Sequence, residues 1–434
     1  MEHIVIIGNG IAGVTAARHI RKLSDKKITI ISAETDYFFS RTALMYVYMG
    51  HMRWENIKPY EDWFWEKNRL ELLTGYVKSI DPKKSTLHFA DGGHMSYDQL
   101  IIASGSTTNT FGWKGLELEG VQGLVTKGDL EMLEKNAPNK KICPHAVIVG
   151  GGLIGVELAE MLRTREIEVT MLVREKAFWT SALPLAEGEL LSQHIQSHGV
   201  TILHETNLDT ILGDANGKVQ GVVIKETQEE LACNLVGITT GVKPNIAFLD
   251  GSGIETDKGI LVNRKLETNI PNIYAIGDCA QQREPIGNRA AVEAVWYTGR
   301  MMGEVVAQTI CGRETTYNPG HWFNSAKFFD IEFQTYGWVQ PKSRRKDYEA
   351  QFHWKHKDHT KFMTLAYHKE QRTFLGINTF GIRMKHEVFD RWLTEERSID
   401  FVIEHLKEAN FDPEFYIHHE EEIRNAFNNT PVTA

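Results

Sequence analysis

The sequence predicts an α/β protein with more than one domain, and three observations carry this prediction. A strand, a glycine-rich loop and a helix follow one another twice, once at the amino terminus and once near residue 150. The 434 residues exceed what one ordinary hydrophobic core holds. Residues 320–434 place strands first and helices after them, which is typical of an α+β domain.

The first loop follows residues 3–7, HIVII, whose continuous apolar run favours a strand buried on both faces of a parallel sheet. The loop Gly8-Asn9-Gly10-Ile11-Ala12-Gly13 comes next, and a helix-like apolar stripe follows it. In G-x-G-x-x-G the first glycine makes the turn, the second admits a pyrophosphate and the third lets helix and strand pack. Phosphates then face free N–H groups at the positive end of the helix dipole.

The strand KITIIS comes next and ends near Glu34. A carboxylate at this distance from the loop accepts hydrogen bonds from the ribose hydroxyls of an adenosine. Strand, loop, helix and acidic residue therefore stand in the order that a dinucleotide site requires.

The second copy is AVIVGGGLIGVELAEML, in which Gly150, Gly152 and Gly155 take the same three roles around Leu153 and Ile154. The strand EVTMLV then leads to Arg174 and Glu175. An arginine at this position suits the 2′-phosphate of NADPH, whereas a carboxylate suits NADH. The two residues therefore give opposite indications, and we lean slightly to NADPH. Arg174 could also be a solvated turn residue with no role in coenzyme binding. Two such folds in one chain predict two dinucleotides, and the useful pair is a flavin with a nicotinamide.

Three further segments complete an ordered set of five motifs. QLIIASGSTTN contains Ala103, Ser104 and Gly105; LVGITTGVKPN contains Gly241; TNIPNIYAIGDCA contains Asp278. Over roughly residues 1–340 the set resembles the pyridine nucleotide–disulfide oxidoreductase family of flavoproteins. The resemblance implies FAD together with NADH or NADPH.

The resemblance also implies a division into domains, with two Rossmann-like folds and the NAD domain inserted in the FAD domain. Residues 1–115 and 263–319 would form the FAD domain, 116–262 the NAD(P)H domain and 320–434 a C-terminal α+β interface domain. Residues 278–310 carry apolar spacing that predicts one helix, whose N-terminal end would point at the flavin pyrimidine ring.

The resemblance gives roles to individual residues. Asp278 would bind the ribityl chain of FAD, and Glu157 would lie near the nicotinamide. With the two loops, it predicts cofactor contacts at Gly8, Gly10, Ile11, Ala12, Gly13, Glu34, Arg41, Val77, Ala103, Ser104, Gly105, Asp278, Gly150, Gly152, Leu153, Ile154, Gly155, Glu157, Arg174 and Gly241.

One departure narrows the chemistry. The disulfide reductases of this family carry C-x4-C after the second FAD strand, whereas this chain has YFFSRTALMYVYMGH there and no cysteine. A relay through a thiolate beside the flavin is therefore not expected from this region. Cys143, Cys233, Cys279 and Cys311 lie far apart, which favours incidental thiols.

The same stretch is similar to the ferredoxin and rubredoxin reductase and apoptosis-inducing-factor-like branch. Arg41 matches an arginine that pairs with the FAD pyrophosphate, which suits a guanidinium. Tyr46 replaces a lysine that sits beside the flavin; it would either stack near the flavin or fill the space. Trp322, Phe323 and Ser325 also match this branch.

The C-terminal region predicts strands at 348–356, 361–370 and 372–381 and helices over 387–411. In many family members this domain forms a dimer, so a homodimer stays open. His353, His356 and His359 should not converge, because strand residues three apart face opposite sides, and no metal site is expected. The aromatic cluster from Tyr60 to Trp65 would be either a docking face or the packing of a helix under the cofactor domain.

Composition bounds the partners. The net charge of −9 gives no support for nucleic-acid binding. The start Met1-Glu2-His3 lacks the basic residues of a signal peptide and no apolar run is long enough for a membrane span, so we expect a cytoplasmic protein. The polar residues 420–434 should not anchor the chain to a bilayer.

We therefore expect an FAD-dependent NAD(P)H oxidoreductase. Hydride would pass from the nicotinamide to flavin N5, and the electrons would leave to a small redox protein, a ferredoxin or rubredoxin. A quinone or another small molecule is the alternative acceptor. A redox-regulated binding flavoprotein with slow turnover is the alternative from a different class.

Overall fold

The computed structural model describes residues 1–411 and 417–430. It divides into two compact units, each described separately. Unit 1 contains residues 1–112, 120–138 and 238–319, and unit 2 contains residues 113–119, 139–237 and 320–434. The finer division into an FAD domain, an NAD(P)H domain and an interface domain stays a prediction. Within the described ranges, no helix has the length and apolar character that crossing a bilayer requires.

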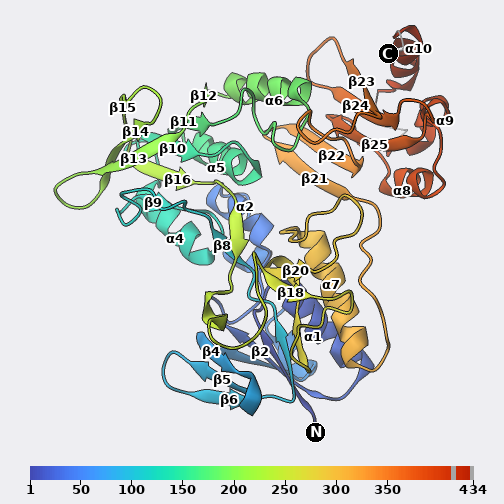
Figure 1. Ribbon diagram of the computed structural model, residues 1–434. Coiled ribbons are helices and arrows are strands. Elements are labelled where there is room, and N and C mark those ends of the chain that lie inside the picture. The colour runs from blue at the N-terminus through green and yellow to red at the C-terminus, as the bar shows by residue number, and fades with distance from the viewer. Residues whose placement is uncertain (412–416, 431–434) are drawn as a thin grey trace. The chain divides into compact units, whose positions relative to one another are not determined.

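Unit 1 is built on a parallel sheet of five strands in the order β19-β7-β1-β2-β3 (Figure 1). The predicted strand at residues 3–7 is its central strand, and all but its first residue are buried. The direction in which successive strands are added reverses at β1, because β2 lies on one side of it and β7 on the other. In open parallel sheets a ligand binds beyond the carboxyl ends of the strands at such a point. The strands are β1 (His3–Ile7), β2 (Lys27–Ser32), β3 (Leu70–Thr74), β7 (Gln99–Ile102) and β19 (Ile273–Ala275).

Helices α1 (Ile11–Leu23) and α7 (Trp296–Ile310) pack side by side in unit 1 (Figure 1). Their close approach depends on glycine. A Cβ on Gly303 would lie 2.6 Å from the carbonyl oxygen of Ala12 and 3.1 Å from the backbone nitrogen of Ala16. Backbone atoms cannot yield as a flexible side chain would, so α7 needs a residue without a side chain here.

The aromatic cluster from Tyr60 to Trp65 lies at and just before the short helix α3 (Trp63–Lys67). Tyr60, Phe64 and Trp65 pack on the main core, whereas the side chain of Trp63 is 56% exposed. Of the two roles considered for the cluster, helix packing is therefore confirmed for most of it. The remaining elements of unit 1 are α2 (Leu44–Tyr48), α4 (Lys127–Asn136), β4 (Val77–Asp81), β5 (Thr86–Phe89), β6 (His94–Ser96), β8 (Ser106–Thr108), β9 (Val121–Gln122), β17 (Val242–Pro244), β18 (Ile260–Val262) and β20 (Ala280–Gln282).

The prediction of one helix over residues 278–310 is wrong in its first half. Residues 277–279 form a single 3-10 turn, β20 pairs with β18, and the helix begins only at Trp296. Pro285 and Gly287 interrupt the apolar spacing, and the backbone N–H of Gln282 donates to the carbonyl of Ala291, which a helix would not allow. Asp278 is therefore not on the helix. The first turn of α7 still packs near it, because Gly299 lies against Gly277.

Unit 2 contains a second parallel arrangement, with β12, β11, β10 and β16 adjacent in that order. Its helices α5 and α6 follow β10 and β11, as in the first fold (Figure 1). A small antiparallel sheet, β13-β14-β15, is attached. The elements are β10 (His145–Val149), α5 (Leu153–Thr164), β11 (Glu168–Val173), α6 (Leu185–Ser197), β12 (Val200–His204), β13 (Leu208–Gly213), β14 (Val219–Ile224), β15 (Glu230–Ala232) and β16 (Leu235–Ile238).

The rest of unit 2 is the C-terminal α+β region. Its antiparallel sheet has the order β21-β22-β25-β24-β23, and helices pack on it around a core that includes Trp354, Phe389 and Trp392. The strands predicted at 348–356, 361–370 and 372–381 and the helices predicted over 387–411 are confirmed, whereas α10 was not predicted. The elements are β21 (Phe323–Phe328), β22 (Ile331–Gly337), β23 (Glu349–Lys355), β24 (Phe362–His368), β25 (Phe374–Phe380), α8 (His386–Thr394), α9 (Ile399–Glu404) and α10 (Glu420–Asn429). Of the segment predicted not to anchor the chain, residues 431–434 lie outside the described residues.

Polar contacts join the two parts of unit 2. The Asn378 amide on β25 donates a 2.8 Å hydrogen bond to the carboxylate of Glu187, a fully buried residue of α6. Burial raises the pKa of Glu187 to about 8, so the carboxyl is largely protonated near neutral pH. Lys327 on β21 also forms a 2.7 Å ion pair with Glu160 on α5. The second fold and the C-terminal sheet are thus held as one body.

Replacing Gly303 by alanine tests the packing of α1 on α7. We expect the free energy of unfolding to fall by about 1–3 kcal/mol, because the new methyl group must displace helix backbone. Urea denaturation followed by circular dichroism measures this. The matched control is Gly128→Ala in α4, where the nearest atom, Thr126 Oγ1, lies 3.5 Å away and stability should stay equal or rise. Equal stability of Gly303→Ala and the parent would contradict the packing argument.

Candidate functional site

The first glycine loop divides its glycines between packing and access. Gly8 has φ of +112°, and a Cβ on it would lie 2.1 Å from the carbonyl oxygen of Ala103. A Cβ on Gly13 would lie 2.1 Å from the carbonyl oxygen of Gly8. Gly10 differs, since no described atom lies within 4 Å of its Cβ position. The loop therefore leaves open space at the N-terminal end of α1, where N–H groups and the helix dipole favour an anion. A pyrophosphate fits this arrangement.

Glu34 and Arg41, predicted to hold the ribose and the pyrophosphate, lie together in unit 1 and form an ion pair. Glu34 also accepts a 2.7 Å hydrogen bond from the Lys127 backbone N–H, and Arg41 donates at 2.9 Å to the Val125 carbonyl. Three of the five donor positions of the guanidinium are thus used, twice on Glu34 and once on Val125. Donors remain for a phosphate beside the carboxylate.

Asp278 lies beside the end of β7. The Ser106 hydroxyl donates a 2.8 Å hydrogen bond to its carboxylate, and burial raises the pKa of Asp278. The neighbouring Ser104 hydroxyl donates to the carbonyl of Asn245 at 2.7 Å. β8 pairs antiparallel with β17 just after Gly241, whose φ is +91°. The structure therefore brings together the predicted segments around Ala103–Gly105, Gly241 and Asp278.

The other predicted residues of unit 1 have less specific positions. Ile11 and Ala12 begin α1, and Val77 is the buried first residue of β4. Tyr46 is half-buried on α2, with its ring 6.2 Å from that of His51. Both roles predicted for Tyr46 stay predictions.

The second glycine loop, in unit 2, repeats the geometry of the first. Gly150 has φ of +122° between β10 and α5, and a Cβ on Gly151 would lie 2.8 Å from a methyl carbon of Val173. Around Gly152 the space is nearly open, since the nearest described atom is Trp179 Nε1 at 3.9 Å. Leu153, Ile154 and Gly155 form the first turn of α5. The sequence analysis did not single out Trp179; its place beside the loop follows from packing on Phe328 and Phe333, which sequence spacing does not reveal.

Two charged positions follow the second loop. The side chain of Arg174 is 70% exposed after β11, and its Nε lies 3.4 Å from the carboxylate of Glu175. An exposed arginine is available to a phosphate, but the adjacent carboxylate leaves the choice of coenzyme open. Glu157 on α5 is half-buried, and burial, with a smaller contribution from Glu160, raises its pKa to about 7.

The family model that matches residues 2–303 is described as pyridine nucleotide-disulphide oxidoreductase. The chain belongs to this family. It is accordingly an FAD-dependent NAD(P)H oxidoreductase, as the two loops and their open glycine positions predict.

Relatives span different lengths around this shared part. The chain is 31% identical to the NAD(P)H nitrite reductase of Bacillus subtilis (strain 168) over 319 residues, which cover 72% of this chain but only 38% of that relative. It is 30% identical to a ferredoxin–NAD(P)(+) reductase of Sphingomonas sp over 344 residues, which cover 77% of this chain and 80% of that one. The crystal structure of the covalent putidaredoxin reductase–putidaredoxin complex matches with a TM-score of 0.82 at 19% identity, covering 99% of each chain.

The thiols of this family member are not arranged for disulfide chemistry. All four cysteines are free, and Cys143, Cys233 and Cys279 are buried. Burial raises the pKa of Cys143 to about 11 and that of Cys233 to about 12, and it also raises the pKa of Cys279. The reactive thiolate is therefore scarce at neutral pH. A thiol relay is not supported by any of these three residues.

Thiol titration of the native protein tests this burial. At pH 8 we expect a disulfide reagent such as DTNB to modify only the half-buried Cys311 readily, with the other three cysteines reacting after denaturation. The Cys311→Ser variant should lose the early reaction and nothing else. Rapid reaction of two or more thiols in the folded parent would show that a buried cysteine is accessible.

Proposed function

We propose that the chain oxidises NADH or NADPH and delivers the electrons to a small iron–sulfur protein of the ferredoxin or rubredoxin type. The choice of acceptor rests on the cysteines: residues 37–51 contain none, and three of the four thiols are buried. The chain is also 30% identical to a ferredoxin–NAD(P)(+) reductase over most of both lengths. Without a thiol relay, electrons leave directly from the flavin. When bound, FAD supplies the step from a two-electron hydride donor to a one-electron acceptor.

We place the FAD in unit 1. The open position at Gly10 would receive the pyrophosphate, with backbone N–H groups of Ile11, Ala12 and Gly13 around it. Arg41 would add its remaining donors to the phosphates, while Glu34, which Arg41 orients, would accept from the ribose. Further contacts are assigned to Val77, Ala103, Ser104, Gly105, Gly241 and Asp278.

Asp278 has a narrower task in this proposal. Its carboxylate accepts a hydrogen bond from the Ser106 hydroxyl, burial raises its pKa, and it would accept a further hydrogen bond from a hydroxyl of the ribityl chain. The side chain is positioned by the turn after β19 rather than by α7.

We place the nicotinamide coenzyme in unit 2, against Gly150, Gly152, Leu153, Ile154 and Gly155. Arg174 would contact the adenosine end, where a 2′-phosphate selects NADPH and a hydroxyl selects NADH. Glu157 would lie near the nicotinamide. Burial raises its pKa to about 7, so the protonated form is accessible near neutral pH and can donate a hydrogen bond to the carboxamide.

We also propose a cytoplasmic location. The negative net charge disfavours binding to nucleic acid, whose phosphates are negative as well. A homodimer through the C-terminal α+β region stays a prediction.

Anaerobic spectroscopy of the purified flavoprotein tests the function. NADH or NADPH should bleach the flavin absorbance, and the more effective coenzyme decides the role of Arg174. Oxidised ferredoxin or rubredoxin should then restore the colour much faster than a soluble quinone does. Faster reoxidation by the quinone would favour the small-molecule acceptor, and bleaching without fast reoxidation by either would favour a redox-regulated binding protein.

Gly10→Ala tests where the flavin binds. Residue 10 has φ of −72°, which alanine adopts without strain, and no described atom lies within 4 Å of the new methyl group. We therefore expect unchanged thermal stability of the flavin-free protein, but FAD affinity at least about tenfold weaker, since roughly 1.4 kcal/mol of lost contact suffices. Equilibrium titration with FAD measures this, and Gly128→Ala is the matched control. Undiminished FAD affinity would place the flavin elsewhere.

A further inference from the structure

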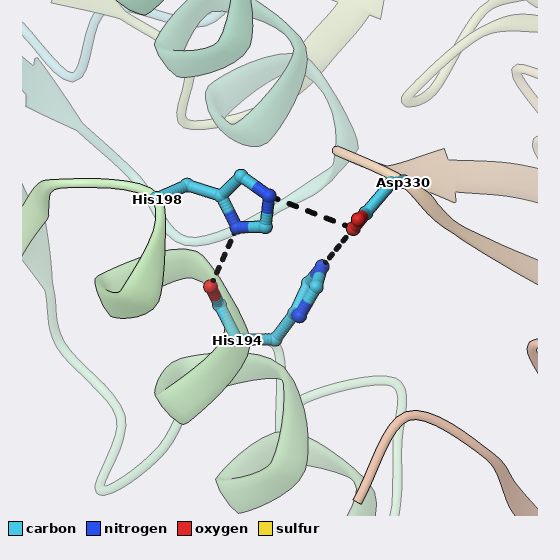
Figure 2. Close-up of side chains that lie close together, drawn as sticks. All are labelled: His194, His198 and Asp330. Carbon is cyan, nitrogen blue, oxygen red and sulfur yellow. Dashed lines mark hydrogen bonds and ion pairs between the residues drawn. The ribbon is translucent and has the colours of Figure 1, made fainter. Parts of the chain in front are cut away.

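A cluster of two imidazoles and a carboxylate lies in unit 2 and includes none of the residues assigned to either coenzyme. His194 lies in the last turn of α6, His198 follows one turn later at the end of the helix, and Asp330 lies between β21 and β22 (Figure 2). Asp330 Oδ1 is 2.6 Å from His194 Nε2 and 3.6 Å from His198 Nε2. One ligand atom from each residue lies within 4.8 Å of the other two.

The turn that presents Asp330 is held in an uncommon conformation. Phe328 pairs with Ile331, so Phe329 and Asp330 form a two-residue hairpin turn. Phe329 has φ of +55°, which a bulky residue rarely adopts. Its ring is buried and stacks on the imidazole of His198, with centroids 4.5 Å apart. This contact fixes both the turn and the ring.

Polar contacts orient the two imidazoles toward Asp330. His198 Nδ1 lies 3.0 Å from the carbonyl oxygen of His194 and donates to it, which leaves the lone pair on Nε2, the atom facing Asp330 (Figure 2). His194 Nε2 is buried and forms an ion pair with Asp330 Oδ1 at 2.6 Å, so the atom that would bind a metal already faces the shared carboxylate. A backbone carbonyl behind an imidazole is the usual way in which metal-binding histidines are oriented.

We propose that His194, His198 and Asp330 form a binding site for a divalent transition metal ion, with Zn²⁺ as the best match. Two imidazoles and one carboxylate suit Zn²⁺, whereas Mg²⁺ and Ca²⁺ prefer sets of oxygen ligands. Ligand bonds of about 2.0–2.2 Å in a tetrahedral site separate the donor atoms by roughly 3.3–3.6 Å. Asp330 and His198 already have this separation, at 3.6 Å, whereas Asp330 and His194, at 2.6 Å, would move apart when the ion binds. Water completes the coordination, since the Asp330 side chain is 73% exposed.

The ion would join α6 to the β21–β22 hairpin. These elements belong to the two parts of unit 2 that Asn378–Glu187 and Lys327–Glu160 already connect. A metal that binds only the folded arrangement stabilises it by mass action, so the site predicts a stability that depends on Zn²⁺.

A second cluster must be separated from this one in any test. His356, His419 and Glu422 also lie close together, which the sequence analysis did not predict, while His353 bonds Thr364 instead. His356 Nδ1 is already 2.7 Å from Asp358, so this cluster is partly engaged. The variant His356→Gln removes its contribution and serves as the background for the measurements.

Calorimetric titration of the flavin-loaded His356→Gln protein with Zn²⁺ tests the site, with Asp330→Asn and His198→Gln added singly. We expect one bound Zn²⁺ in the background protein, a higher thermal midpoint with Zn²⁺ and no effect of Mg²⁺. Each added substitution should weaken binding by more than the roughly 10–100-fold cost of losing a group behind a ligand. His88→Gln, in a strand of unit 1, is the matched control and should change nothing.

A spectroscopic readout guards against a folding effect. Cu²⁺ takes the same ligands more tightly. Its electron paramagnetic resonance spectrum should show two imidazole nitrogens in the background protein and one in His198→Gln, while the exposed Asp330→Asn keeps both. Equal Zn²⁺ affinity in the background protein, Asp330→Asn and His198→Gln would overturn the proposal and leave the cluster as an ion pair. A copper spectrum that is the same in the background protein and His198→Gln would overturn it as well.

Discussion

The first fold depends on glycines that let backbone atoms of neighbouring elements approach where a Cβ atom would otherwise lie. The carbonyl oxygen of Ala103 occupies the place of a side chain at residue 8, and the carbonyl oxygen of Gly8 occupies the place of one at residue 13. These approaches bring β1, β7 and α1 together so tightly that the N-terminal end of α1 opens directly beyond the sheet. Gly303 has the same role where α7 packs on α1, because a Cβ there would collide with the backbone of α1. Anion binding at Gly10 is thus a consequence of packing, because the loop that lets the elements meet also exposes unpaired N–H groups.

The chemistry follows from what stands around that loop. The disulfide reductases of this family need a thiolate beside the flavin, whereas the corresponding segment of this chain has no cysteine and contains Arg41, the ring of Phe39 and helix α2. The three buried cysteines have raised pKa values and sit within apolar cores, where they behave as small hydrophobic residues. The structure therefore leaves the coenzymes to carry the electrons, and the protein contributes binding and orientation.

Sequence reasoning succeeded where a local pattern has one physical explanation. The strand at residues 3–7, both glycine loops and the C-terminal strands all follow from periodicity and turn residues. It failed over residues 278–295, where apolar spacing resembled a helix but Pro285, Gly287 and pairing of β20 with β18 decided the structure. It also missed the contact between His194, His198 and Asp330. The spacing of the two histidines on a helix was visible, but the carboxylate arrives from a hairpin far along the chain.

Helix α6 explains why the C-terminal sheet belongs to the same unit as the second glycine loop. Along one helix, a buried carboxyl bonds to β25 and two imidazoles face the β21–β22 turn. The contact between Glu187 and Asn378 is buried. Burial raises the pKa of Glu187, so its carboxyl is largely neutral, and a neutral carboxyl costs less free energy to bury than a charged one. The second contact is partly open to water, where a charge is tolerated. Helix α6 thus contacts the C-terminal sheet at two separate places, through a buried neutral carboxyl at β25 and through a partly exposed cluster at the β21–β22 turn, and two such contacts restrain the sheet against α6 more than one would.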